Sequence, residues 1–86
     1  MAKMQDVPRK VSPDPIGQIF GASIRRLREN RGWTQEQLAE QAEMSVTYLG
    51  FIERGENVPT LTIILKLADA FGVNPGRLVD EVARSR

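Results

Sequence analysis

The sequence predicts an all-α fold, a compact bundle of five short helices, and two kinds of observation support this. Apolar residues recur at spacings of three and four along most of the chain, which is the period of an α-helix with one buried face. Residue types that begin and end helices divide this pattern into segments. The expected helices span about residues 16–30, 35–42, 45–54, 61–71 and 75–82.

Helix-capping residues set the limits of the first three expected helices. Gly32 ends the first helix, and Thr34 and Gln37 have the spacing of a capping box, so the second begins after Thr34. Ser45 is an N-cap residue type, and Gly55 stands where a helix favours a left-handed residue after its last turn. The second and third helices are too short to be stable alone, so the rest of the chain must support them. The expected buried faces are Ile16, Phe20, Ile24 and Leu27 in the first helix, Leu38, Ala39 and Ala42 in the second, and Leu49 and Ile52 in the third.

The fourth expected helix contains a segment that also has the composition of a strand. Residues 60–65 are rich in β-branched side chains, which are common in strands. Strict alternation fails within this segment, whereas the helical period continues to Phe71, so a helix is the prediction. Thr60 caps this helix and Gly72 ends it, and Asn74–Pro75 starts the fifth. The expected inward face of the fourth helix is Leu61, Ile64, Leu65, Ala68 and Phe71.

A second apolar stripe on the fourth helix exceeds what a monomer core of this size needs. Together with the fifth helix it predicts a surface for a homodimer. The alternative is a single packed monomer core, since domains of this size can fold alone. The expected interface residues are Ile63, Leu67, Ala70, Leu78, Val79 and Val82.

Composition excludes several classes of function. The 86 residues form one small domain without cysteine or histidine, so disulfides, thiolate chemistry and the usual zinc ligand sets are absent, and we expect no metal and no cofactor. The chain has no phosphate-binding loop and no acidic pair outside solvated helix faces, so an enzyme or a small-molecule ligand is not expected. No segment is apolar enough to span a bilayer, and we expect a cytoplasmic protein that does not contact a membrane.

Bulk charge gives no argument for a nucleic-acid partner. The net charge is +1, and residues 16–58 hold five arginines and six glutamates, a net of −1. Any basic footprint must therefore come from the placement of single charges.

Five short motifs in order resemble the helix-turn-helix of the phage Cro/repressor-type (Xre-like) transcription regulators. They cover about residues 16–82, and the T-Y-L and I-E-R-G wording is most similar to the controller proteins of restriction–modification systems. The resemblance implies a lambda-repressor-like DNA-binding domain whose third helix enters the major groove of double-stranded DNA. The motifs are R-x-L-R at 25–28, G-W-T-Q-E-Q-L-A at 32–39, S-V-T-Y-L at 45–49, I-E-R-G at 52–55, and P-T-L with L-A-x-A-F-G-V at 59–73.

The same resemblance implies two sets of DNA-contacting residues. Val46, Thr47, Phe51 and Arg54 lie on the expected outer face of the third helix and would contact bases, with a phosphate contact as the alternative for Arg54. The positions implied for phosphate contacts are Gln35, Ser45, Tyr48 and Asn57. Tyr48 is expected to pack its ring at the rim of the core with the hydroxyl reaching a phosphate, and for Asn57 a plain turn residue is the alternative.

The chain departs from the family pattern at three positions. Glu43 stands at the turn where the family usually has glycine. A left-handed conformation there costs a non-glycine residue about 1 kcal/mol, so the turn is either strained or slightly rebuilt. Gly50 weakens the middle of the third helix by roughly 0.5–1 kcal/mol relative to alanine. Phe51 occupies a face where relatives commonly carry a polar or basic residue, so it would contact thymines or belong to a protein-binding surface.

By resemblance, Arg28 and Glu53 form a partly buried ion pair between the first and third helices. Each follows a buried residue by one helical turn, which draws it inward, and an inward charge requires a partner. The alternative is two independent surface charges.

The two ends are expected to lie outside the domain: a flexible arm over residues 1–15 and a frayed tail over 83–86. A basic arm that follows a DNA groove is the alternative for residues 1–15. The function predicted for residues 16–82 is a homodimeric, sequence-specific DNA-binding regulator on a roughly palindromic site. The alternative is a protein-interaction module on the same scaffold.

Overall fold

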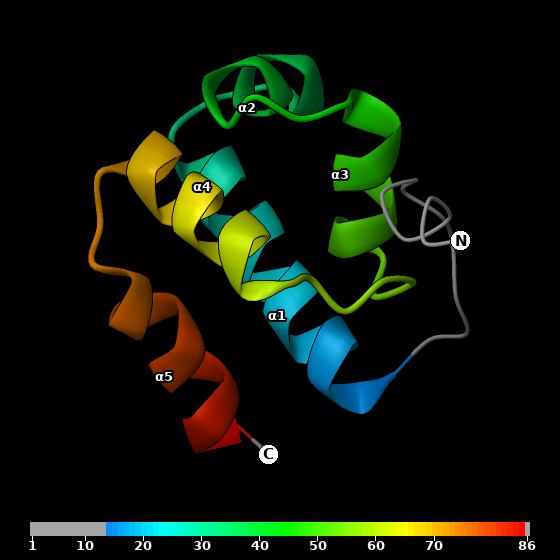
Figure 1. Ribbon diagram of the computed structural model, residues 1–86, viewed down its shortest axis with the longest axis vertical. Coiled ribbons are helices and arrows are strands. Elements are labelled where there is room, and N and C mark those ends of the chain that lie inside the picture. Colours follow the sequence, from blue (N-terminus) through cyan, green and yellow to red (C-terminus); the bar gives the residue numbers. More distant parts are fainter. Residues whose placement is uncertain (1–13, 86) are drawn as a thin grey trace, which may run out of the picture.

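Five α-helices make up the fold of the computed structural model, which describes residues 14–85 (Figure 1). They are α1 (Pro15–Asn30), α2 (Gln35–Gln41), α3 (Val46–Glu53), α4 (Leu61–Phe71) and α5 (Pro75–Ser85). Residues 14–85 contain no strand, so the all-α prediction is confirmed. Within this range, no helix combines the length and the apolar character needed to cross a bilayer.

Side-chain caps fix where the helices begin. Thr34 and Gln37 form the expected capping box at the start of α2. The hydroxyls of Ser45 and Thr60 accept hydrogen bonds from backbone N–H groups in the first turns of α3 and α4. Asp14 caps α1 by accepting from the N–H of Ile16 at 2.8 Å. Each cap satisfies donors that a helix end leaves without an intrahelical partner.

Both predicted domain limits need correction. The prediction places Asp14 and Pro15 in the arm, but they cap and begin α1, because proline at the first helical position needs no N–H partner. The rest of the predicted arm, residues 1–13, lies outside the described residues. At the other end, α5 continues to Ser85, so residues 83–85 are helical and not a frayed tail. Residue 86 lies outside the described range.

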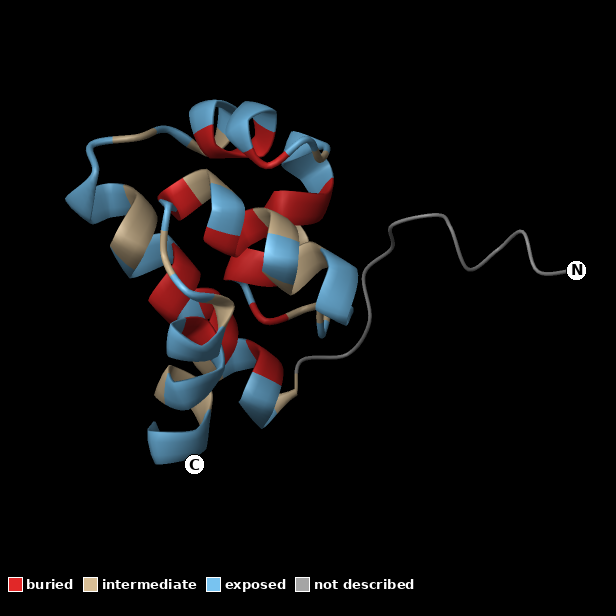
Figure 2. Ribbon diagram, turned by 60° about the vertical axis from the view of Figure 1, so that its left-hand side comes forward, coloured by how far each residue is buried: buried red, intermediate tan, exposed pale blue. Residues whose placement is uncertain are grey.

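The core lies where all five helices meet (Figure 2). α1 packs on α3 and on α5, α2 on α3, and α4 on α5. The largest fully buried side chains are Ile24, Leu38, Leu49, Ile52, Leu67 and Leu78. Fully burying one such side chain contributes about 1.5–3 kcal/mol.

The buried stripe of α4 differs from the predicted one. Leu61 is 69% exposed and Leu65 44% exposed, whereas Leu67 is fully buried beside Ala68 and Phe71. Both stripes have helical spacing, so periodicity alone could not decide between them. Ile16 of α1 is likewise 45% exposed and lies outside the core.

Glycines on α1 let the end of α3 approach closely. A β-carbon on Gly21 would overlap the carbonyl oxygen of Ile52 and lie 2.9 Å from that of Glu53. Gly55 follows α3 with φ 74°, and a β-carbon there would lie 2.7 Å from the α-carbon of Gln18. Backbone therefore packs on backbone where α1 supports α3.

An aromatic pair packs beside the C-terminal end of α1. The ring of Trp33 stacks on that of Phe71, with centroids 5.7 Å apart and planes 9° apart. The Arg31 guanidinium lies 5.5 Å and 5.4 Å from the two ring centroids and donates a hydrogen bond to the carbonyl of Phe71 at 2.8 Å. Trp33 thus packs in the fold, consistent with a structural role.

Candidate nucleic-acid interface

The turn between α2 and α3 keeps its left-handed residue without a glycine. Glu43 has φ 56°, the only positive φ at a non-glycine residue among residues 14–85. The next residue, Met44, donates its N–H to the carbonyl of Ala39 at 2.9 Å, which closes the turn. The turn geometry is therefore retained, and the strain expected of a side chain in this conformation is about 1 kcal/mol.

The outer face of α3 holds the residues predicted to contact bases. Val46, Thr47 and Arg54 are exposed and Phe51 is half-buried, while the opposite side of the helix contributes Leu49 and Ile52 to the core. No other helix of residues 14–85 buries Val46, Thr47 or Arg54, whereas Gly50 in the middle of α3 is buried. A helix anchored on one side and open on the other has the form that can enter a major groove.

Arg28 and Glu53 lie in contact and join α1 to α3. Arg28 Nε donates to Glu53 Oε2 at 2.7 Å and Nη2 donates to Oε1 at 3.1 Å, a bidentate pair. The side chains are 11% and 3% exposed, and Arg28 Nη1 also donates to the carbonyl of Trp33 at 2.8 Å. The hydrogen bond to Glu53 raises the pKa of Arg28 against the opposing effect of burial. The network leaves neither charge unpaired, which a buried ion requires.

Gln35 belongs to this network as well as to the predicted phosphate contacts. Its Nε2 donates to Glu53 Oε1 at 2.9 Å, so the carboxylate connects the first residue of α2 with α3 and α1. Sequence reasoning missed this bond, because nothing local links residues 35 and 53. The side chain remains half-exposed at the start of α2.

Tyr48 lies deeper than expected. Its residue is only 9% exposed, and the hydroxyl donates to Asn57 Oδ1 at 3.3 Å. Burial raises the pKa of the Tyr48 phenol. The prediction of a rim position with a hydroxyl reaching phosphate is therefore wrong for the ring: the tyrosine is a core residue, and its hydroxyl links α3 to the loop that contains Asn57.

Two of the residues predicted for the dimer interface are wrong. Leu67 and Leu78 are sealed inside the monomer at 0% and 2% exposure, so they have no surface to offer a partner. Ile63, Ala70 and Val82 are half-buried and Val79 is exposed. The second apolar stripe of α4 thus serves mainly the monomer core.

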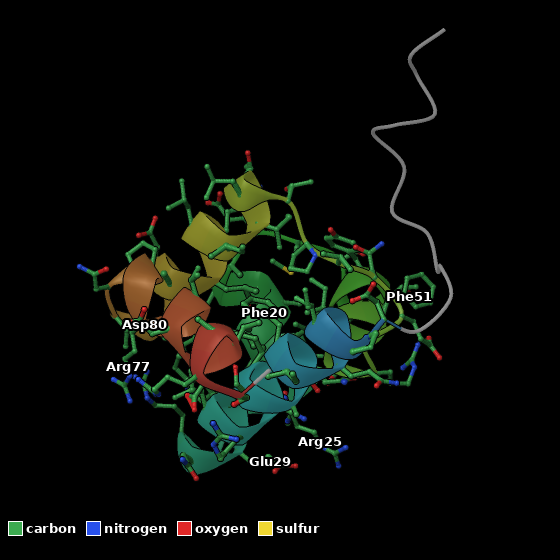
Figure 3. The ribbon with its side chains drawn as sticks, turned by 90° about the horizontal axis from the view of Figure 1, so that it is seen from below. Phe20, Arg25, Glu29, Phe51, Arg77 and Asp80 are labelled. Carbon is green, nitrogen blue, oxygen red and sulfur yellow. The ribbon has the colours of Figure 1, made fainter. Side chains whose placement is uncertain are left out.

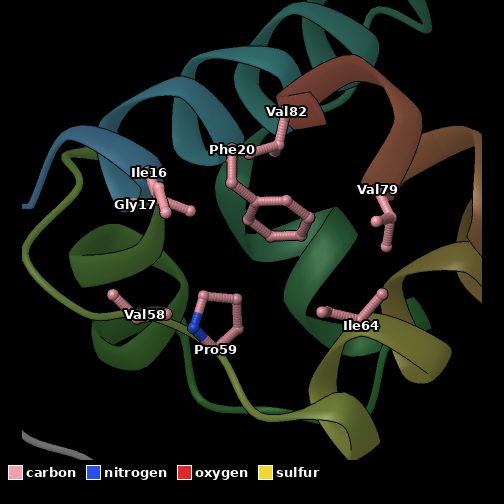
Figure 4. A pocket seen from close by; sticks show the side chains of 8 residues that line it. All are labelled: Ile16, Gly17, Phe20, Val58, Pro59, Ile64, Val79 and Val82. Carbon is pink, nitrogen blue, oxygen red and sulfur yellow. The ribbon is translucent and has the colours of Figure 1, made fainter. Parts of the chain in front are cut away.

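An apolar pocket of about 130 Å³ opens beside these helices (Figure 4). It lies between the start of α1, the α3–α4 loop, α4 and α5. Its lining contains no ionisable side chain, so it offers no acid, base or nucleophile. The lining residues are Ile16, Gly17, Phe20, Val58, Pro59, Ile64, Val79 and Val82. Among residues 14–85 no group of three Asp or Glu side chains is arranged to hold a metal ion.

Two short helices, a left-handed turn between them, and an uncovered face on the second together define the helix-turn-helix class. The chain belongs to the helix-turn-helix family, whose model matches residues 24–78. Its relatives include the HTH-type transcriptional regulator YazB of Bacillus subtilis, itself uncharacterised, which is 39% identical over 61 residues, or 71% of this chain and 88% of the relative. The immunity repressor of Bacillus phage phi105 is 39% identical over 61 residues, covering 71% of this chain and 42% of the repressor.

A solved structure with the same fold is that of the restriction–modification controller protein C.AhdI from Aeromonas hydrophila. It is 39% identical, with a TM-score of 0.70 over 72% of this chain and 94% of the controller. The similarity agrees with the sequence motifs, and the resemblance to this family is confirmed. The chain therefore belongs to a family of transcription regulators and not of enzymes.

Proposed function

We propose that this protein is a sequence-specific, DNA-binding transcription regulator that acts in the cytoplasm as a homodimer on a roughly palindromic operator. The observation that carries the proposal is the outer face of α3, which residues 14–85 leave uncovered while its inner face is fixed in the core. The proposed regulator places one α3 helix of each subunit in successive major grooves, about 34–36 Å apart.

The chemistry of the exposed face suits base recognition. Thr47 offers a hydroxyl for hydrogen bonding and a methyl for thymine, and Val46 offers apolar contact of the kind a thymine methyl takes. Arg54 carries the donors that pair with guanine O6 and N7. Phe51 contributes an apolar edge beside Arg54.

Polar groups around this face are proposed to hold the DNA backbone. Gln35 is held by Glu53 at the start of α2, and Ser45 is exposed at the start of α3. Asn57 is linked to α3 through the Tyr48 hydroxyl, so in this proposal Tyr48 supports a phosphate contact by positioning Asn57. Such contacts set the register of the protein on DNA, whereas base contacts specify sequence.

The proposed dimer uses exposed apolar residues of α4 and α5, of which Val79 lines the pocket of Figure 4. Leu61 and Leu65 lie one turn apart on the outer side of α4, and Val79 is exposed on α5. A two-fold contact that buries this surface on both subunits is self-complementary. Leu61 and Leu65 replace Leu67 and Leu78 of the predicted interface, while Ile63, Ala70, Val79 and Val82 are retained.

A selection of bound sequences from a random DNA pool tests the proposal. We expect one enriched, roughly palindromic site, on which Thr47→Ala and Arg54→Ala each cost about 1–3 kcal/mol and relax preference at one position per half-site. Arg77→Ala is the matched control, because Arg77 is exposed on α5, across the molecule from α3 (Figure 3). Recovery of no enriched sequence would overturn the proposal.

A further inference from the structure

The side chain of Arg54 is held by three neighbours. Its Cζ lies 5.6 Å from the centroid of the Phe51 ring, and its Nε donates to Glu56 Oε1 at 3.1 Å. A β-carbon on Gly50 would lie 3.0 Å from Arg54 Nη1 and 3.7 Å from Cζ, so the guanidinium occupies the space beside the missing side chain.

These contacts turn the guanidinium back along α3. Arg54 follows the last residue of the helix, but side chains on a helix lean toward its N-terminus, and Gly50 lies one turn earlier. The charge is therefore placed beside the middle of the exposed face. Without Gly50 and Phe51, the guanidinium would have neither the open space beside α3 nor the ring face on which it packs.

Two departures from the family pattern thus meet at one side chain. Gly50 weakens the helix and Phe51 adds an aromatic ring to a face that is usually polar, so neither is explained by the stability of α3 alone. Both contact Arg54. A side chain already held in its bound conformation loses less rotamer freedom on binding than a mobile one.

We propose that Gly50, Phe51 and Glu56 are positioning residues that orient Arg54 for recognition of a guanine. This inference rests on the proposed function. Glu56 engages Nε, so in this proposal the two Nη groups are left to donate to the O6 and N7 acceptors of the base. Glu56 also neutralises Arg54, which is the one cation in residues 45–54, and thereby weakens attraction to phosphates of any sequence.

The proposal separates binding strength from sequence discrimination. With Glu56 in place, Arg54 adds little to the affinity for random DNA. A guanine at the right position in the operator, in contrast, offers two acceptors to a guanidinium that needs little rearrangement to bind them. A purely structural role for the Arg54–Glu56 pair predicts no change in discrimination when the pair is altered, since exposed ion pairs contribute little to stability.

The test compares Gly50→Ala and Glu56→Gln with the wild type. The control for Glu56→Gln is Asp80→Asn, which also removes one negative charge. Asp80 is exposed on α5, far from Phe51 (Figure 3). Affinities for the selected operator and for a random duplex are measured over a range of salt concentrations, with thermal unfolding recorded for each variant.

Gly50→Ala is expected to unfold at the same or a higher temperature, because alanine favours a helix over glycine. The ratio of its affinity for the operator to its affinity for a random duplex is nevertheless expected to fall by roughly 5- to 150-fold. This fall corresponds to the loss of one base contact. Glu56→Gln is expected to bind random DNA more tightly, with a salt dependence steeper by about 0.9 per added phosphate contact. Asp80→Asn should leave the ratio and the salt dependence close to those of the wild type.

The positioning proposal alone is overturned if Arg54→Ala weakens binding to the operator but neither Gly50→Ala nor Glu56→Gln changes the ratio of operator affinity to random-duplex affinity. A wild-type protein that shows no preference for any sequence overturns the proposed function, and this inference with it. The two failures are distinguishable in the same set of titrations.

Discussion

Replacing Gly21 by alanine tests the contact that supports the proposed reading helix. A β-carbon at this position would overlap the Ile52 carbonyl oxygen and lie 2.9 Å from the Glu53 carbonyl oxygen. Both are backbone atoms at the end of α3, so no side-chain rotation relieves the clash, and the cost lies at the upper end of overpacking, about 3 kcal/mol. Alanine regains about 1 kcal/mol of helix propensity. The net destabilisation is about 2 kcal/mol, which lowers the melting temperature by roughly 8–16 °C.

Gly17→Ala is the matched control one turn earlier on the same helix. A β-carbon there would lie 3.4 Å from the Gly55 carbonyl oxygen and from a Val58 methyl group, which is ordinary contact. We expect this variant to melt at or above the wild-type temperature in calorimetry or circular dichroism. A Gly21→Ala protein that melts as the wild type does, or higher, would refute the backbone-on-backbone contact between α1 and α3.

Three further predictions concern stability. Glu53→Ala leaves Arg28 buried without its carboxylate, so chemical denaturation should show a loss of about 3–5 kcal/mol, and an unchanged midpoint would remove the pair from the account. Glu43→Gly relieves the left-handed side chain and should raise the free energy of unfolding by about 1 kcal/mol; an equal or lower value would mean that the turn is unstrained. Burial raises the pKa of Tyr48, so the unfolded state loses the phenolic proton first, and stability that is present below pH about 10 should decline as the pH rises above it. Tyr48→Phe should lack this part of the alkaline decline. The free energy of unfolding is compared between pH 9 and pH 11, roughly the window around a tyrosine pKa. Identical slopes of this free energy against pH in the two proteins would contradict the burial of Tyr48.

Local signals account for the part of the fold that the sequence predicted well. Caps and glycine stops act over a few residues, so Thr34, Ser45, Thr60 and Gly72 placed helix ends close to their observed positions. For Glu43 the motif left two alternatives, a strained left-handed residue or a rebuilt turn, and the positive φ of Glu43 shows the first.

Contacts between distant residues were harder to predict. Both apolar stripes of α4 satisfy the helical period, and only packing against α5 and the core shows that Leu67 is inside and Leu61 outside. The Gln35–Glu53 and Tyr48–Asn57 hydrogen bonds join positions whose separation carries no periodic signal.

One missed feature did have a signal in the sequence. Gly17 and Gly21 stand four residues apart in a helix that otherwise has strong apolar spacing. Glycine costs a helix interior about 0.5–1 kcal/mol, so two on one face indicate a close approach of another backbone. That reasoning would have identified the surface of α1 that supports α3.

The proposed major-groove contact of α3 is tested most directly by a substitution scan of the selected operator. Uracil in place of thymine removes one major-groove methyl, and 7-deazaguanine in place of guanine removes one major-groove acceptor, while the minor groove is unchanged. We expect the substitutions that lower the affinity to fall in two clusters centred about 10–10.5 base pairs apart. The guanine substitution that lowers the affinity of the wild type should leave the affinity of Arg54→Ala unchanged. Binding that tolerates every such substitution would contradict the account.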